Sequence, residues 1–265
     1  MADSQAITTD EWQEHWLKHK SVASWDYLSQ IILDVLLENT PSSQALNYLE
    51  AGSGTGRISL RLAGMGNNVR LVDISEAAQQ ISKKLFKDAG HKGKFHNCSV
   101  TDMPFEDGSF DVVWNAGLLE HFSHDEQKEI LCEMTRVCAD GGLVIMFNPC
   151  GTSPFFKVGL FISNILRTWP YGFEAQMRDS AGIVEGLSIE VEKEYKAGFF
   201  VIFVEGFRFI PGFSWATLAL RKLFIALSIS PIGGFLSKCD RILSRLLGGY
   251  LLVSIMKKKR INEGS

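Results

Sequence analysis

The sequence predicts an α/β protein whose central sheet is doubly wound and mostly parallel. Between residues 45 and 148, short apolar runs with the composition of strands alternate with amphipathic stretches of helical period. A glycine-rich turn follows the first of these runs, where a strand would pass into a helix. Such short alternation is typical of β-α-β units, in which helices cover both faces of a parallel sheet.

Seven strands are expected along the chain. Five of them fall at 45–50, 68–73, 94–99, 110–115 and 142–148, and two more at 190–201 and 249–256. Helices are expected between the first five strands, near 56–65, 75–89 and 124–138. Ser123 and Glu126 have the spacing of a capping box at the start of the third of these helices, and Gly141 with Gly142 is expected to end it.

Four segments make up the chain. They are an N-terminal helical segment at 1–44, the core at 45–150, an irregular segment, strand and cap at 151–248, and the last strand with a basic tail at 249–265. The aromatic stretch 10–39 is expected to be helix packed on the edge of the core rather than a lid over a site. Residues 151–182 are predicted to be irregular, and the apolar residues 202–248 to form a helical hydrophobic cap inserted before the last strand.

Charge and cysteine content exclude several classes of protein. The chain has 27 basic and 30 acidic residues, a net charge of −3, so it lacks the basic field that drives nucleic-acid binding. The five cysteines are widely spaced and form no C-x-x-C, which argues against a disulfide framework and against a metal site. The first 14 residues contain no apolar signal region, and the uncharged run 223–237 is short and broken by proline and glycine. We therefore expect a cytoplasmic protein.

The charge is unevenly distributed along the chain. Residues 197–265 hold ten basic and three acidic residues and eight of the 18 phenylalanines, whereas residues 1–196 are acidic. Within the predicted helix 235–247, the basic residues that share one face are Lys238, Arg241 and Arg245. The apolar residues of the opposite side are Leu236, Cys239, Leu243 and Leu246. Three interpretations of 197–248 stay open: a cap alone, a cap that also makes peripheral membrane contact, and a dimer surface.

The glycine-rich turn has the sequence Leu49-Glu50-Ala51-Gly52-Ser53-Gly54-Thr55-Gly56-Arg57. Glycines let the backbone approach a ligand, and the amides at a helix N-terminus attract negative charge. A dinucleotide fingerprint would need a glycine where Arg57 stands. Glu50 would repel a pyrophosphate but would favour a ligand that carries an ammonium or sulfonium group.

Two more carboxylates follow strands at the same predicted edge. Asp73, 19 residues beyond Gly54, ends the second strand, where it could accept hydrogen bonds from ribose hydroxyls. Asp102 lies in a polar turn after the third strand, where it could accept from the exocyclic amine of an adenine.

These three ordered motifs resemble the class I S-adenosylmethionine-dependent methyltransferases, specifically their small-molecule methyltransferase domain. The resemblance covers about 45–150 and implies a Rossmann-like fold with S-adenosyl-L-methionine as cofactor. It implies contacts to the methionine moiety from Gly52, Gly54, Gly56, Glu50 and Asn115. It also implies that Asp73 holds the ribose, that Ile74 packs on the adenine, and that Asp102 and the Met103 backbone read the adenine edge. For Ile74 and Met103, a role as ordinary core residues stays open.

The segment after the fourth strand contains Leu119-Glu120-His121, which resembles a block of the ubiquinone-biosynthesis type of O-methyltransferase. An unperturbed imidazole titrates near pH 6.5, so His121 could act as a general base toward a hydroxyl nucleophile. It could instead orient the loop or pack beneath the cofactor.

The function expected from the resemblance is methyl transfer to an O, N or C nucleophile of a small, apolar or amphiphilic acceptor. Two alternatives are a NAD(P)-dependent oxidoreductase and a catalytically silent cofactor-binding or membrane adaptor protein.

Overall fold

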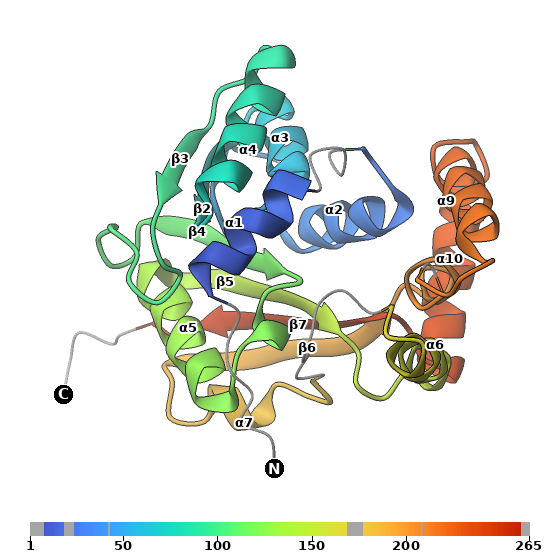
Figure 1. Cartoon of the computed structure of the whole chain (residues 1–265). Coiled ribbons are helices and arrows are strands. Elements are labelled where there is room, and N and C mark those ends of the chain that lie inside the picture. The colour runs from blue at the N-terminus through green and yellow to red at the C-terminus, as the bar shows by residue number, and fades with distance from the viewer. Residues whose placement is uncertain (1–7, 19–23, 42, 169–176, 208, 261–265) are drawn as a thin grey trace.

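A seven-stranded mixed sheet runs through the centre of the molecule (Figure 1). The computed structural model describes residues 8–18, 24–41, 43–168, 177–207 and 209–260. The strands are β1 Asn47–Ala51, β2 Asn68–Asp73, β3 Lys94–Asn97, β4 Phe110–Ala116, β5 Cys138–Pro149, β6 Ile189–Ala197 and β7 Leu251–Lys258. Their order in the sheet is β3-β2-β1-β4-β5-β7-β6, and β7 runs antiparallel to both of its neighbours while the other pairs are parallel. The doubly wound, mostly parallel, Rossmann-like fold is therefore confirmed.

Helices cover both faces of the sheet (Figure 1). Their bounds are α1 Thr9–Lys18, α2 Tyr27–Asn39, α3 Arg57–Gly64, α4 Glu76–Asp88, α5 His124–Val137, α6 Pro154–Ile165, α7 Ala181–Val184, α8 Ile202–Glu205, α9 Ser214–Ser228 and α10 Gly233–Leu247. A 3₁₀ helix, η1, spans Leu119–His121. Side chains of α2, α3 and α4 pack with Tyr48 and Trp114 on one face, and those of α5 and α7 pack with Leu49 and Val113 on the other. The alternation of side chains along β1 and β4 separates these two cores.

The predicted core strands and helices are all present, and their bounds differ from the prediction by at most four residues. Strand β2 matches its predicted bounds, and Ser123 and Glu126 form the capping box at the start of α5. The prediction that Gly141 and Gly142 end this helix is wrong, because α5 ends at Val137 and β5 begins at the next residue. Both glycines lie instead where the pairing of β5 with β4 shifts register.

The N-terminal segment 10–39 contains two helices with different environments. Helix α2 packs on the core through buried Ile32, Leu33 and Leu36, as predicted for the whole segment. Helix α1 has no buried residue and lies over the glycine-rich turn. The prediction of packing on the core edge is therefore right for α2 and wrong for α1.

The prediction that 151–182 is irregular is wrong for its first half. Helix α6 begins there with Pro154 in its first turn, a position where proline costs no hydrogen bond. Residues 169–176 lie outside the described part of the chain. Strand β6 ends at Ala197, before the predicted 201, because Gly198 turns the chain with a φ of 80°.

The apolar insertion is helical, as predicted, and consists of α8, α9 and α10. Helix α10 packs against β6, while α9 contacts α2, α8 and α10. Figure 1 shows α6, α9 and α10 grouped on one side of the molecule. The helix that covers the glycine-rich turn is α1 rather than a helix of the insertion.

Candidate functional site

The candidate site lies at the carboxyl ends of β1, β2 and β4. The strand order reverses between β1 and β4, and open α/β sheets bind ligands at such a point. Register places Glu50 of β1 beside Leu71 of β2 and Trp114 of β4. The polar residues that end these strands are thereby brought to one edge of the sheet.

The glycine-rich turn forms a backbone cradle at this edge. Its glycines have left-handed φ values of 68°, 51° and 63° at Gly52, Gly54 and Gly56. The Gly54 amide donates to Asp73 Oδ2 over 2.7 Å, and the Gly54 carbonyl accepts from Ser82 Oγ over 2.8 Å. A side chain at Gly54 would combine an unfavourable φ with the loss of room for neighbouring groups.

Asp73 is buried and fixes the shape of this cradle. Its Oδ2 accepts from Gly54, and its Oδ1 accepts from the Ser75 amide over 2.9 Å. Burial raises the pKa of Asp73, while these two amide hydrogen bonds oppose the rise. Each carboxylate oxygen has a further lone pair, so Asp73 could accept from ribose hydroxyls while it holds the turn. Asn97 supports the same turn by donating to the carbonyls of Asp73 and Ile74 over 3.0 and 2.9 Å.

Glu50 is only 6% exposed, and its Oε2 has no hydrogen-bond partner among the described residues. Burial raises the pKa of Glu50 to about 8, against smaller opposing effects of Ser59 and Arg57. A buried carboxylate is costly to ionise without a positive partner. A cationic group bound beside Glu50 would supply that partner.

Asn115 and Asn148 add buried amide groups at the ends of β4 and β5. Asn115 Nδ2 donates to Met134 Sδ over 3.7 Å, while its Oδ1 has no partner in the described part of the chain. Side-chain alternation directs Asn115 toward α5 and Glu50 toward α3, so the two lie on opposite faces of the sheet. Neither polar atom of the Asn148 side chain has a partner among the described residues, and no sequence motif had pointed to this residue.

The residues expected at the adenine differ in their environments. Ile74 is exposed just beyond β2, and Asp102 is exposed beyond β3. The Met103 amide donates to Glu133 Oε1 over 2.7 Å, its carbonyl accepts from Arg136 Nη2 over 3.0 Å, and its side chain is buried in the core. Met103 is therefore a core residue whose amide already has a partner, which differs from the expectation that its backbone reads the adenine edge.

Arg136 of α5 is a residue that sequence reasoning missed. Besides Met103, its guanidinium donates to the Phe105 carbonyl and to the carboxylates of Asp107 and Glu133, each over 2.7 Å. It therefore fixes the loop between β3 and β4. A basic residue in the last turn of a helix is common, so its position alone carried no signal.

Comparison with known proteins identifies the kind of domain to which this edge of the sheet belongs. Residues 49–146, which include Glu50, the three glycines and Asp73, match the family model described as a methyltransferase domain. The chain contains a class I S-adenosylmethionine-dependent methyltransferase domain.

Relatives with different methyl acceptors align with this methyltransferase domain. The chain is 29% identical over 119 residues to ajmaline N-methyltransferase of Rauvolfia serpentina, covering 41% of this chain and 38% of that protein. It is 33% identical over 101 residues to a ubiquinone/menaquinone biosynthesis C-methyltransferase of Ralstonia pickettii (strain 12J), covering 37% and 41%. The aligned part spans less than half of the length of either relative.

A solved structure extends the likeness in fold to the whole chain. Geranyl diphosphate C-methyltransferase from Streptomyces coelicolor A3(2), in complex with Mg²⁺, geranyl diphosphate and S-adenosyl-L-homocysteine, has a TM-score of 0.56 and 15% identity. The match covers 94% of this chain and 84% of that one. The family implies S-adenosyl-L-methionine as the cofactor of the methyltransferase domain. The residues present fit that group, since the free Oε2 of buried Glu50 suits its cationic amino-acid end and Asp73 suits its ribose.

Helix α1 lies across the same edge of the methyltransferase domain. Gln13 Oε1 accepts from Ser75 Oγ over 2.9 Å and from the Ala77 amide over 3.0 Å, at the start of α4. A Cβ at Gly54 would lie only 2.6 Å from the Trp16 ring. Neither Gln13 nor Trp16 was singled out from the sequence, although they are spaced to share one face of a helix.

His121 lies in η1, beside α1. Its ring packs edge-on against Trp12, with 5.0 Å between ring centroids, and its Nε2 lies 3.9 Å from Glu120 Oε1. Burial, and then the proximity of His15, lower the pKa of His121 to about 4. The imidazole is therefore neutral at pH 7, the form that can accept a proton.

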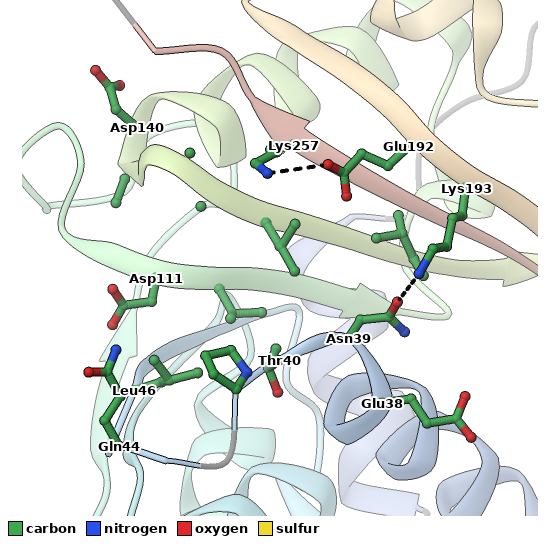
Figure 2. Close-up of a pocket in the computed structure, with 17 residues that line it drawn as sticks. Glu38, Asn39, Thr40, Gln44, Leu46, Asp111, Asp140, Glu192, Lys193 and Lys257 are labelled. Atoms are coloured by element: carbon green, nitrogen blue, oxygen red, sulfur yellow. Dashed lines mark hydrogen bonds and ion pairs between the residues drawn. The ribbon is translucent and has the colours of Figure 1, made fainter.

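A separate cavity lies at the other edge of the sheet. This hollow has a volume of about 470 Å³. Along its wall, Glu192 pairs with Lys257 at 3.4 Å, and Lys193 Nζ donates to Asn39 Oδ1 over 3.0 Å. Figure 2 shows both interactions. It lies near Asp111, toward the amino end of β4, and none of the predicted site residues lines it. Among the described residues, no group of three or more histidine, cysteine or acidic side chains is arranged to hold a metal ion.

Proposed function

We propose that the chain transfers the methyl group of S-adenosyl-L-methionine to an O, N or C nucleophile of a small, apolar or amphiphilic acceptor. The observation that carries this proposal is the cradle at the edge of the sheet. There a left-handed glycine turn is held by Asp73 beside the buried carboxyl of Glu50, whose Oε2 has no hydrogen-bond partner among the described residues, within the segment that matches the methyltransferase domain.

Each residue has a defined role in this proposal. The bound cofactor supplies a methyl group already activated by its sulfonium, so the protein mainly aligns the acceptor and excludes water. The backbone of Gly52, Gly54 and Gly56 lines the methionine moiety, and Glu50 balances its ammonium. Asp73 holds the ribose, and Ile74 with Asp102 contacts the adenine. Asn115 lies beside the methionine end.

His121 is proposed as the base for an acceptor that arrives protonated. Its neutral form at pH 7 and its position just beyond β4 support this role. Trp12 and the rest of α1 lie over it, which would keep water away from the proton transfer.

We further propose a cytoplasmic protein whose 197–248 region makes peripheral contact with membranes. The exposed apolar and basic side chains of α9 and α10 support such contact. An amphiphilic acceptor would be reached most directly by a protein held at a membrane surface.

The experiment that tests the proposed function is calorimetric titration of the full chain with S-adenosyl-L-homocysteine and, separately, with NAD(H). We expect S-adenosyl-L-homocysteine to bind and NAD(H) not to bind. Binding of NAD(H) alone would favour the oxidoreductase, which would also have to accommodate Arg57 and the antiparallel β7 inserted between β5 and β6.

A screen with labelled cofactor against lipid and quinone-like extracts identifies the acceptor. A methylated product supports the enzyme. Cofactor binding without transfer to any extract would favour the silent adaptor protein.

A further inference from the structure

Helix α9 exposes an apolar face to its surroundings. Its exposed positions recur with helical period and are Ser214, Trp215, Leu218, Ala219, Lys222, Leu223 and Ala226. Trp215 is 73% exposed. A helix on the surface of a water-soluble domain normally turns its polar side outward, so this arrangement indicates a surface that meets something other than water.

Helices α6 and α10 also expose apolar side chains. Helix α6 exposes Val158, Phe161 and Ile165 along one side. Helix α10 exposes its basic residues together with Phe235, Ile242 and Leu246.

The sequence prediction placed Leu246 on the side of the helix opposite the basic residues, whereas in the structure Leu246 is 73% exposed, as the basic residues of the helix also are exposed. The inward side of α10 combines the buried polar residues Asp240 and Ser244 with Leu236 and Leu243, which pack against the core. Asp240 accepts from the Gly198 and Phe200 amides over 2.9 and 3.1 Å, and Ser244 Oγ accepts from the Phe199 amide over 2.9 Å.

The exposed charges on these three helices all have the same sign. Their basic residues are Lys157, Arg221, Lys222, Lys238, Arg241 and Arg245, and their single acid, Asp240, is only 4% exposed. Arg221 and Arg241 are paired with acids of the α2 region. Within the described part of the chain, the other four have no ion-pair partner.

The helices are too short to cross a bilayer. In the described residues, no single helix has the length and apolarity to span a membrane, and α9 and α10 pass such a test only together, with a bend of 119° between them. Each has 15 residues, which at 1.5 Å per residue is about 22 Å against a hydrocarbon thickness of about 30 Å. Their length and mixed apolar and basic surface suit helices that lie in the membrane interface.

We propose that the exposed sides of α6, α9 and α10 form a membrane-binding face for an anionic lipid bilayer. In it Phe161, Trp215 and Phe235 enter the interface, and the unpaired lysines and Arg245 meet the anionic headgroups. A second copy of the chain is a poorer occupant, since an isologous contact would bring these like charges together.

The membrane-binding face adds α6 to the region 197–248, for which membrane contact was proposed above. The way in which this face would bring the acceptor to the site rests on the proposed function. Helix α6 begins at Pro154, shortly after β5 ends at Pro149. The membrane-binding face therefore borders the carboxyl edge of the sheet, where an amphiphile held in the bilayer would present its headgroup.

Co-sedimentation with vesicles tests the face on the full chain. The variant is Phe161→Ser, Trp215→Ser and Phe235→Ser combined, and the matched control replaces three exposed apolar residues outside the face, Leu37→Ser, Met65→Ser and Val191→Ser. We expect wild type and control to bind equimolar phosphatidylcholine and phosphatidylglycerol vesicles at low salt, more weakly at high salt, and the variant to bind about tenfold or more weakly.

Several outcomes would overturn the membrane-binding face. They are equal binding by the variant and wild type, no binding of wild type to anionic vesicles at low salt, or a wild-type dimer that the triple variant makes monomeric in sedimentation equilibrium. Titration of the same samples with S-adenosyl-L-homocysteine separates the two proposals. Vesicle binding without cofactor binding refutes the proposed function alone, and cofactor binding without vesicle binding refutes the membrane-binding face alone.

Discussion

Glu50 combines full burial, an unpartnered oxygen and a pKa raised by burial to about 8. The free protein therefore keeps much of this carboxyl protonated at pH 7, and a cationic ligand should displace the proton. We expect calorimetry at pH 7, in two buffers of different ionisation enthalpy, to show proton release on S-adenosyl-L-homocysteine binding that is absent in Glu50→Gln. Equal proton release in both proteins would contradict this role.

The stability of Glu50→Gln provides an independent check. Because the folded pKa lies above the ordinary value of 4.5, the contribution of Glu50 to stability is lost as the pH rises from about 4.5 to 8. Glu50→Gln should therefore be more stable than wild type above pH 8, in thermal unfolding. A variant less stable than wild type at that pH would show that Glu50 is a stabilising ion instead.

Asp73 serves both the cradle and the ligand. The sequence alone suggests that Asp73→Ala weakens cofactor binding and leaves the fold intact, but the structure shows that the carboxylate also accepts from the Gly54 and Ser75 amides. We expect Asp73→Ala to weaken S-adenosyl-L-homocysteine binding strongly and to lower the free energy of unfolding by about 1–3 kcal/mol. Denaturant titration and calorimetry measure the two effects, and an unchanged affinity refutes the ribose role.

His121 has a neutral imidazole at pH 7. If it is the base, the acid limb of the rate profile for a hydroxyl acceptor should fall near pH 4 rather than near pH 6.5, and His121→Ala should lower kcat by about 10²-fold or more. The measurement is a pH profile with the acceptor found in the labelled-cofactor screen. An unchanged kcat in the variant would contradict the role of His121 as the base and would favour a role in orienting its loop.

At the scale of elements, α1 contacts the site without belonging to the core. Because it has no buried residue, Gln13→Ala with Trp16→Ala should leave the melting temperature nearly unchanged. The same double variant should weaken S-adenosyl-L-homocysteine binding by about tenfold, since it uncovers the cradle. The matched control is Glu14→Ala with Lys18→Ala, an exposed ion pair on the same helix. Equal affinity in both double variants would mean that α1 does not contribute to the site.

Asp26 joins three elements: it caps α2 by accepting from Ser29, and it pairs with Arg57 of α3 and Arg221 of α9. Burial tends to raise the pKa of Asp26, but Arg57, Ser29 and Arg221 outweigh it and lower the pKa below 3.8. The stability from this carboxylate is therefore present above about pH 3.8 and is lost as the pH falls further.

Substitution of Asp26 should weaken the attachment of α9 to α2 and α3. We expect Asp26→Asn to lower the free energy of unfolding at pH 7 by about 2–4 kcal/mol, because it leaves two arginines without their buried partner. Arg241→Gln, which breaks an exposed pair with Glu38, should cost only about 0–1 kcal/mol. Similar losses in the two variants, measured by denaturant unfolding, would contradict the linking role of Asp26.

At the scale of the whole molecule, the sequence predicted the α/β core well and the surrounding segments less well. Strand β2 was predicted residue for residue because its buried apolar residues lie between polar residues, Asn68 at its start and Asp73 at its end. Helix α6 was missed because its run of apolar residues on several sides hides the helical period.

The residues of the candidate site likewise divide into those that the sequence predicts and those that it does not. The glycine turn, Glu50 and Asp73 follow from local pattern, since glycine conformation and strand ends are read directly along the chain. The contacts of Trp16 and Arg136, and the hydrogen bonds of the Met103 backbone with Glu133 and Arg136, depend on tertiary contacts between distant segments. No local pattern specifies such contacts.

The acidic and basic parts of the chain form different parts of the structure. The acidic part of the chain forms most of the sheet with the cradle, while the basic C-terminal part supplies α9 and α10. In our proposals the cradle holds the methyl donor, and the membrane-binding face brings the molecule to its acceptor.

The edge formed by β1, β2 and β4 is proposed to bind S-adenosyl-L-methionine, and the other proposals depend on it. The most direct test is calorimetric titration of the full chain with S-adenosyl-L-homocysteine, with NAD(H) as the competing ligand. We expect one binding site per chain for S-adenosyl-L-homocysteine, strongly weakened by Asp73→Ala, and no heat from NAD(H). Absence of S-adenosyl-L-homocysteine binding to a folded wild-type chain would contradict this proposal.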